Sequence, residues 1–266
     1  QASNYVEEHA NNKTPSEISI DDLASAANYK DKLTIKDGKL CVTSKASEEE
    51  RKVAKDLGIK TEDPITFTKQ GDLALGSEVT ASNGEPFYVI GGDAVGTPIS
   101  ADTQTVILLA KYNLTSDGKS QDTSGASNEC AFSSTNYWSS VEGIEYPDEE
   151  CPDEEDKYPD LNDETKYGSD STSMITTAKA YGESLGVTGR LMTYEETKAL
   201  QTNYSEILYG KNTENGYLNY WLSSAYSGDV VIYIQGYFSC PGYADGTNSS
   251  ECGVRSVVTV PVSLFK

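Results

Sequence analysis

Residues 219–266 read NYWLSSAYSGDVVIYIQGYFSCPGYADGTNSSECGVRSVVTVPVSLFK, and the two apolar runs in this stretch decide the fold class. In DVVIYIQ, residues 229–235, residues alternate as they do in a strand with one face on the core. The residues expected to face the core are Val230, Ile232 and Ile234. Those expected to face solvent are Asp229, Val231, Tyr233 and Gln235.

The final run, GVRSVVTVPV at residues 253–262, predicts the last strand. Its expected inward residues are Val254, Val258 and Val260. Proline has no amide proton for a central ladder, so Pro261 indicates that the far end of this strand lies at a sheet edge. The chain is therefore expected to end in β-structure.

Upstream, the period of the sequence changes from helical to alternating near Pro64. Residues 78–92 read EVTASNGEPFYVIGG, in which Asn83-Gly84 between two strand-like runs predicts a β-hairpin. The apolar run TQTVILLAKYNL at 103–114 predicts a buried central strand.

Two helices are expected after a long irregular section at 115–170. The first has an apolar stripe at helical spacing and ends at Gly186. Its stripe consists of Met174, Ile175, Ala178, Tyr181 and Leu185. The second begins at a capping box formed by Thr193 and Glu196. Strands, then helices, then strands predict an α+β domain with helices beside an antiparallel sheet.

The first 63 residues are expected to form a separate helical segment, followed by one domain at 64–266. Helical pieces are expected at 3–13 and 20–29. A third is expected at 48–57, with Ser47 and Glu50 as its capping box and Gly58 as its left-handed C-cap. These pieces are short and only loosely apolar, so we expect an appendage rather than a core.

The charge of the chain excludes some functions. Its 21 Lys and Arg residues face 42 Asp and Glu residues, which gives a formal net charge of -21. Phosphate binding needs clustered cations, so no nucleic-acid partner is expected. Because the only histidine is His9, in an expected surface helix, Ser-His or Cys-His catalysis is not expected. No phosphate-binding glycine loop is present. We therefore expect no enzyme.

The acidic section suggests a metal hypothesis. Twelve acidic residues lie between Glu145 and Asp170, and DLNDETKYGSD at 160–170 offers oxygen ligands for calcium. The glycine of an EF-hand loop is missing, since Thr165 stands at its sixth position. We favour a solvated acidic loop over a calcium site, and no other cofactor is expected.

The five cysteines allow two local disulfides, Cys130 with Cys151 and Cys240 with Cys252, each closing a loop rich in turn residues. Both pairs need an oxidising compartment. Free thiols are the alternative, and Cys41 has no expected partner.

Tyrosine is concentrated near the C-terminus. Eight of the 18 tyrosines lie between Tyr204 and Tyr243, among serine, glycine and asparagine. Antibody-type binding loops have this mixture, because tyrosine gives contact area for little conformational entropy. Tyrosines are also common in strands, so we expect about half of these rings to face solvent. Both tryptophans, in TNYWSS at 135–140 and NYWLSS at 219–224, are expected to be packing anchors.

Six separated motifs resemble, in the same order, a family of bacterial surface proteins with a prepilin-type start and a C-type-lectin-like end. They are GEPFYVIGG, TVILLAKYNL, AFSSTNYWSS, LGVTGRLMTYEETKAL, YWLSSAY and GVRSVVTVPVSLF. The second part, from about Pro64 to Lys266, is similar to the ligand-binding domains that diversity-generating retroelements vary. The chain departs from that pattern at Ser256, where proline is usual, and in its long acidic section.

The resemblance implies an extracellular protein at the cell surface or on a pilus, with its membrane and assembly helix upstream of residue 1. It implies recognition of a protein or glycan on another cell or a phage by the stretch 226–248. The expected contacts are Tyr226, Asp229, Val231, Tyr233, Gln235, Tyr237, Phe238, Tyr243, Asp245 and Asn248. A Cys240–Cys252 bond would stiffen this loop.

Two alternatives stay open. A structural pilus subunit would contact other pilin subunits and bind no ligand. A lectin-like fold also occurs in enzymes that oxidise sulfatases with cysteine and a metal, which would require a convergent pair of reduced cysteines.

Overall fold

A computed structural model describes residues 32–36, 39–43, 46, 48–62, 65–69, 71–147, 157–210, 217–248 and 252–266. The chain forms two compact units. The first is drawn chiefly from residues up to Ile65, and the second contains Thr66–Glu183 and Val187–Lys266. None of the helices within the described residues has the length and apolar character needed to cross a bilayer.

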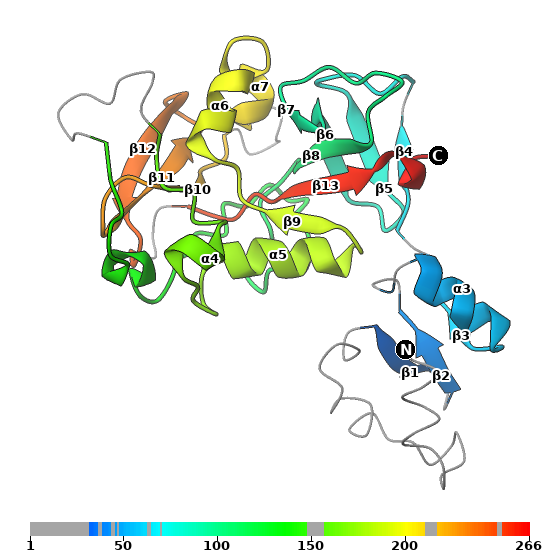
Figure 1. The fold of residues 1–266 in the computed structure, drawn as a ribbon. Helices are drawn as coiled ribbons and strands as arrows, with labels where there is room; N and C mark the ends of the chain where they lie inside the picture. Colours follow the sequence, from blue (N-terminus) through cyan, green and yellow to red (C-terminus); the bar gives the residue numbers. More distant parts are fainter. Residues whose placement is uncertain are drawn as a thin grey trace, which may run out of the picture. The chain divides into compact units, whose positions relative to one another are not determined.

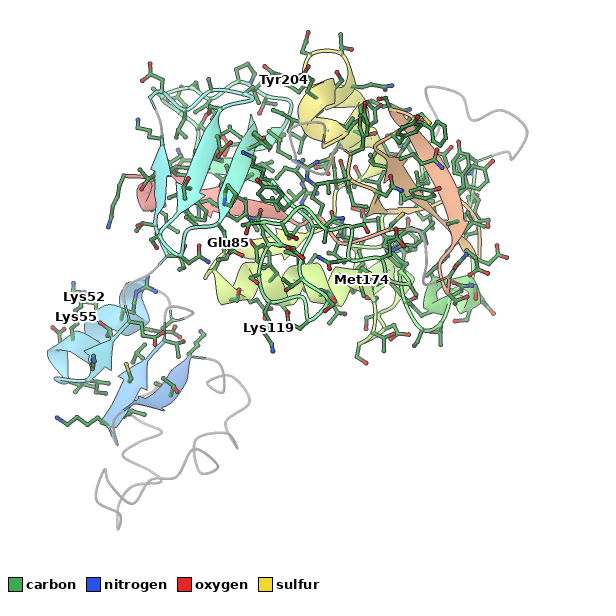
Figure 2. All side chains as sticks on the ribbon, turned by 180° about the vertical axis from the view of Figure 1, so that it is seen from behind. Lys52, Lys55, Glu85, Lys119, Met174 and Tyr204 are labelled. Atoms are coloured by element: carbon green, nitrogen blue, oxygen red, sulfur yellow. The ribbon has the colours of Figure 1, made fainter. Side chains whose placement is uncertain are left out.

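The described part of the first unit is a small sheet with a helix (Figure 1). Strand β1 (Leu33–Lys36) pairs antiparallel with β2 (Lys39–Val42), and β3 (Lys60–Thr61) pairs parallel with β2. Helix α3 (Glu48–Asp56), which carries Lys52 and Lys55 (Figure 2), precedes β3. Its Ala54 packs with Val42 and Ala46 in a small core.

The expectation of a helical first segment is therefore wrong for residues 32–62. The helix expected at 48–57 is confirmed, and Gly58 follows it in the left-handed region at φ 70°. The strands were missed although Asp37-Gly38 between two alternating runs is a hairpin signal. The helices expected at 3–13 and 20–29, and the cap at Ser47, lie outside the described residues.

The second unit contains a seven-stranded sheet in the order β4-β5-β6-β8-β13-β9, with β7 paired to β6. Every pairing in it is antiparallel. Its strands are β4 (Phe67–Lys69), β5 (Glu78–Ala81), β6 (Pro86–Gly92), β7 (Ala94–Val95), β8 (Thr105–Ala110), β9 (Thr188–Arg190) and β13 (Val257–Pro261).

The local predictions for this sheet are confirmed. The hairpin β5–β6 turns at Asn83-Gly84, where Gly84 N donates to Ala81 O. Strand β8 is buried from Val106 to Ala110 between β6 and β13. The inward residues of the last strand, Val254, Val258 and Val260, are buried. Beyond Thr259, β13 pairs with β8 alone, so its end at Pro261 lies at an edge as expected.

The two expected helices are present in the second unit. Helix α5 (Met174–Ser184) buries Ile175, Ala178 and Tyr181. Helix α6 (Tyr194–Gln201) begins at the expected capping box, with both hydrogen bonds between Thr193 and Glu196 formed. Shorter turns are α4 (Glu164–Tyr167), α7 (Ser205–Leu208), η1 (Tyr137–Ser140) and η2 (Val262–Leu264).

A second antiparallel sheet of three strands lies at the other end of this unit, beside α6 and α7 (Figure 1). It consists of β10 (Tyr220–Ala225), β11 (Val230–Gln235) and β12 (Cys240–Asp245). A shared hydrophobic core joins this three-stranded sheet to the seven-stranded sheet of the same unit. It includes Leu109, Leu200, Leu208, Leu222, Ile232, Ile234 and Val257. Two largely antiparallel sheets with helices beside them make the unit α+β.

A buried polar network ties the β5–β6 turn to α5. Glu85, labelled in Figure 2, is buried and accepts hydrogen bonds from Tyr181 Oη at 3.0 Å and from Gln121 N at 2.6 Å. Asn83 Nδ2 donates to the same carboxylate at 2.8 Å. Because this buried carboxylate has several donors, it serves the fold of the turn rather than presenting a reactive group.

Candidate functional site

Both faces of β11 are buried. Ile232 and Ile234 pack into the shared core as expected, but Val230 is only partly buried. Val231 and Tyr233, expected to face solvent, are also buried. The prediction that these two side chains are exposed contacts is therefore wrong, because alternation marks one solvent face only where nothing covers that face.

Aromatic side chains from distant segments cover this second face. Tyr233 lies edge-on against Trp221, with ring centroids 5.8 Å apart. Phe132 packs edge-on against both Trp221 and Trp138, at 5.9 and 5.6 Å. Trp138 Nε1 donates to Ser227 O and Trp221 Nε1 donates to Cys130 O, each at 2.9 Å. Both tryptophans are fully buried, so the packing-anchor interpretation is confirmed.

Five aromatic side chains at the edge of this sheet, at its hairpin tip and just before its first strand are wholly or partly accessible, and they are here called the aromatic edge. The largest exposed fractions belong to Tyr237 at 72% and Phe238 at 69%, followed by Tyr243 at 49% and Tyr217 at 45%. Tyr226 is half-buried beside them. The aromatic edge is defined as Tyr217, Tyr226, Tyr237, Phe238 and Tyr243.

The rings of the aromatic edge support one another. At the hairpin tip, Tyr237 lies edge-on against both Tyr217 and Phe238, with centroids 5.6 and 5.1 Å apart. Along the edge of β12, the ring centroids of Tyr243 and Tyr226 are 4.4 Å apart. Aromatic pairs of this kind contribute about 0.5–1.5 kcal/mol beyond the burial of their area, and so favour these ring orientations over others.

Two tyrosines from outside residues 217–248, Tyr158 and Tyr194, pack beneath the aromatic edge. Tyr158 is buried and stacks on Tyr226 at 5.9 Å, and Tyr194 at the start of α6 packs edge-on against Tyr158 at 5.1 Å. Partial burial, followed by the proximity of the Tyr194 and Tyr226 phenols, raises the pKa of Tyr243. No local pattern points to Tyr158 or Tyr194 as part of this surface, since tertiary packing alone brings them here.

The polar residues expected at the site are at the surface or half-buried. Asp229, Asp245 and Asn248 are exposed, and Gln235 is half-buried. Asp245 Oδ1 accepts from Thr247 N and Oγ1 at 2.8 Å each, and these bonds lower the pKa of Asp245. Asp229 Oδ1 accepts from Ser227 Oγ at 2.7 Å. These carboxylates therefore also order the turns at this end of the sheet.

The stretch of sequence that carries the aromatic edge contributes carboxylates and no cation to this surface. From Tyr217 to Asn248 the sequence contains Asp229 and Asp245 but no lysine, arginine or histidine. Such a surface disfavours phosphates and other anionic ligands.

The cysteines are arranged differently from the expectation. Cys240 is a free thiol whose Sγ lies 3.5 Å from Gln235 Oε1, so the expected Cys240–Cys252 bond is absent. Cys252 lies opposite Cys130 in an isolated antiparallel bridge instead. Cys151, the expected partner of Cys130, lies outside the described residues. Cys41 is a buried free thiol in the first unit.

The described residues contain no group of three or more His, Cys, Asp or Glu side chains that could hold a metal ion. In the 160–170 stretch considered for calcium, Asp163 and Asp170 accept hydrogen bonds from other residues of the protein. Asp163 Oδ1 accepts from Thr165 Oγ1 at 2.6 Å and caps α4, and Asp170 Oδ2 accepts from Thr135 Oγ1 at 2.6 Å.

Comparison with known proteins leaves the site to be interpreted from its geometry. No family model matches the chain, and neither the curated proteins nor the solved structures contain a significant match.

Proposed function

We propose that this protein is a recognition protein of a bacterial surface or pilus, which binds its ligand through the aromatic edge. In this proposal the second unit is a C-type-lectin-like domain, similar to the variable proteins of diversity-generating retroelements. The first unit belongs to a pilin-like segment that displays it outside the cell. The protein has no catalytic role.

The observation that carries the proposal is the exposure of Tyr237, Phe238 and Tyr243 beside two strands, β10 and β11, that are largely buried on both faces. Burying a large ring contributes about 1.5–3 kcal/mol, so exposed rings forgo that stabilisation in the isolated chain. Neighbouring rings already order them, which lowers the entropy lost on binding. Aromatic residues in such settings often dominate binding energy.

The chemistry of the edge narrows the ligand. Phenol rings stack on sugar faces and on apolar or cationic side chains, whereas the acidic surroundings repel anions. A protein or a neutral glycan on another cell or a phage therefore fits the edge better than a nucleic acid does.

A glycan and protein binding array, run with and without calcium, would identify the ligand. Tyr237→Ala, Phe238→Ala and Tyr243→Ala are then expected to weaken its binding at least tenfold each. Leu57→Ala, just after α3, is the matched control, since Leu57 is also an exposed apolar residue, at 58%, but lies on the first unit. Unchanged affinity in all three edge variants, with intact near-UV circular dichroism, would contradict the proposal.

A structural pilus subunit is the second candidate, and one observation favours it. Val53 on α3 and Leu57 just after the end of α3 are both exposed, and Leu57 N donates to Val53 O at 3.1 Å, so the two side chains lie on the same face. An apolar stripe of this kind suits packing against neighbouring subunits. If this candidate is right, Leu57→Glu prevents incorporation into filaments and the edge variants bind all array ligands as the parent chain does. A filament reconstruction would show which surface meets the neighbouring subunit.

The oxidising-enzyme alternative is less well supported. Cys130 and Cys252 do converge, but Cys252 is fully buried, and burial raises the pKa of Cys130 to about 11. A thiol of that kind is a poor nucleophile near neutral pH.

A further inference from the structure

Cys130 and Cys252 are directly opposite each other in the second unit. They form an isolated antiparallel bridge in which Cys130 N donates to Cys252 O at 2.8 Å. Directly opposite residues of an antiparallel pair point their Cβ atoms to the same side. The two thiols therefore start from the same side of this bridge although 122 positions separate them in the sequence.

The backbone spacing of such a pair suits a disulfide. Directly opposite residues of an antiparallel pair have Cα atoms about 4.5–5.5 Å apart, within the range of roughly 4.4–6.8 Å seen for disulfides. Cys130 Sγ at present lies 3.4 Å from Met174 Sδ, at the start of α5 (Figure 2). A change of the Cys130 side chain to another staggered rotamer redirects its sulfur without moving the backbone.

We propose that Cys130 and Cys252 form a disulfide when the protein folds in an oxidising compartment. A thiolate of one cysteine attacks a small-molecule disulfide such as oxidised glutathione and releases one glutathione thiol. The second cysteine, as its thiolate, attacks the resulting mixed disulfide and releases the second. The two cysteines lose two electrons and two protons in total, and the small disulfide is reduced to two thiols.

The cross-link would fasten the sheet that carries the aromatic edge. Trp221 of β10 donates from its indole nitrogen to Cys130 O and from its backbone nitrogen to Gly253 O, the residue after Cys252. The bond would thus join the two segments that flank Trp221. It would close a loop containing α4 to α7 and β9 to β12, and so restrict the unfolded chain. This inference rests on the cysteine geometry and stands whether or not the aromatic edge binds a ligand.

The bond is expected to form during folding rather than afterwards. Cys252 is fully buried and burial raises the pKa of Cys130 to about 11, so little thiolate is accessible in the folded chain. Adding oxidised glutathione to folded, reduced protein at pH 7 should therefore form the bond far more slowly than refolding in the same mixture does.

Peptide mapping tests the pairing directly. The chain is unfolded and reduced, refolded with oxidised and reduced glutathione, alkylated and digested without reductant. The expected product joins the Cys130 and Cys252 peptides and leaves Cys240 alkylated. A Cys130–Cys151 or Cys240–Cys252 product, or alkylation of both Cys130 and Cys252, would overturn the inference.

Stability gives a second, independent measurement. The melting temperature of the refolded chain is expected to fall by roughly 5–10 °C on reduction. Cys130→Ala and Cys252→Ala should each abolish this difference, and the double variant should behave as the single ones do. Cys240→Ala is the control and should keep it. A reduction-dependent difference that survives in either single variant would refute the pairing, whereas a mere packing role of the thiols would lower the melting temperature equally with and without reductant.

Discussion

Gly242 leaves the space that the ring of Tyr233 occupies. A Cβ atom at Gly242 would lie 2.7 Å from Tyr233 Cζ and 2.7 Å from Gln235 Nε2, closer than van der Waals contact allows. Because Gly242 has no side chain, the ring of Tyr233 packs directly on the backbone of β12. This packing explains why a tyrosine that was expected to face solvent is buried.

We expect Gly242→Ala to destabilise the second unit by about 1–3 kcal/mol, because the added methyl displaces Tyr233 from Trp221. Urea unfolding followed by tryptophan fluorescence would measure this. Gly228→Ala is the matched control, since its Cβ would meet Ser139 at an ordinary 3.6 Å. In a Tyr233→Ala background the Gly242→Ala penalty should shrink, and an undiminished penalty would contradict the steric explanation.

Arg255 is a second residue whose role the sequence could not reveal. It is fully buried, with its guanidinium 5.2 Å from the centre of the Tyr220 ring. Its Nε donates to Ala110 O at 2.7 Å and its Nη1 to Ile207 O at 2.7 Å. A cation in a terminal strand usually indicates a solvent face, but this one ties the end of β8 to the end of α7.

Arg255→Met is expected to cost about 2–4 kcal/mol, because buried carbonyl groups lose their donor. Arg255→Lys should restore only part of this, since a single ammonium cannot replace the planar fork of donors. Lys119→Met, at an exposed cation (Figure 2), should change stability by less than about 0.5 kcal/mol. Denaturant midpoints compare the three, and a near-wild-type Arg255→Met would show that the carbonyls find other donors.

Among the elements, those set by local chemistry were predictable and those set by packing were not. The Asn83-Gly84 hairpin and the Thr193–Glu196 capping box depend on residues a few positions apart, and both are confirmed. The burial of the second face of β11 depends on tertiary packing instead: Trp221 packs on Tyr233, and Phe132, about 100 positions upstream of Tyr233, packs on Trp221. The alternating pattern contains no information about that cover.

The carboxylate of Asp170 joins the turn that precedes α5 to the segment at Thr135. This carboxylate accepts from Thr135 Oγ1 at 2.6 Å and from Thr172 N at 2.7 Å, just before the helix begins. The hydrogen bonds from Thr135 and then Thr172 lower the pKa of Asp170 below its ordinary value of 3.8. A carboxylate with a lowered folded pKa stabilises the fold above its ordinary pKa, and this stabilisation is lost as the pH falls through the folded value.

Asp170→Asn is therefore expected to lower the free energy of unfolding by about 1 kcal/mol at pH 7. The difference in stability between the variant and the parent chain should narrow below about pH 3.8. Urea midpoints between pH 7 and pH 2.5 would show this. Asp72→Asn, at an exposed aspartate in the β4–β5 loop, provides the comparison and should track the parent chain. A constant Asp170→Asn deficit at all pH values would mean that the hydrogen bonds do not depend on the ionised carboxylate.

For the whole molecule, the strand order could not be predicted from the sequence. The last strand, β13, pairs with β8 from Val257↔Leu109 to Pro261↔Thr105, and so inserts between strands formed much earlier in the chain. The aromatic edge likewise depends on upstream residues, because Tyr158 stacks on Tyr226 and Tyr194 packs against Tyr158. Composition predicted a tyrosine-rich surface, but which rings remain outside depends on this long-range assembly.

Charge acts on the whole molecule as well. With a formal net charge of -21, like-charge repulsion opposes the compact state. Among the described residues, Arg190 and Glu196 form a forked ion pair at 2.6 and 2.7 Å, which is half-buried and weakly screened by salt. Added salt should therefore weaken the repulsion more than the attraction.

We expect the urea midpoint at pH 7.5 to rise when NaCl is raised from 0.02 to 0.3 M, as the Debye length falls from about 20 Å to about 6 Å. Tryptophan fluorescence reports the second unit, because Trp138 and Trp221, the two tryptophans of the chain, both lie in it. The same series near pH 4.3, the isoelectric point, is the control, since little net repulsion remains there to be screened. A midpoint that falls with salt at pH 7.5 would mean that local ion pairs outweigh the repulsion between the excess carboxylates.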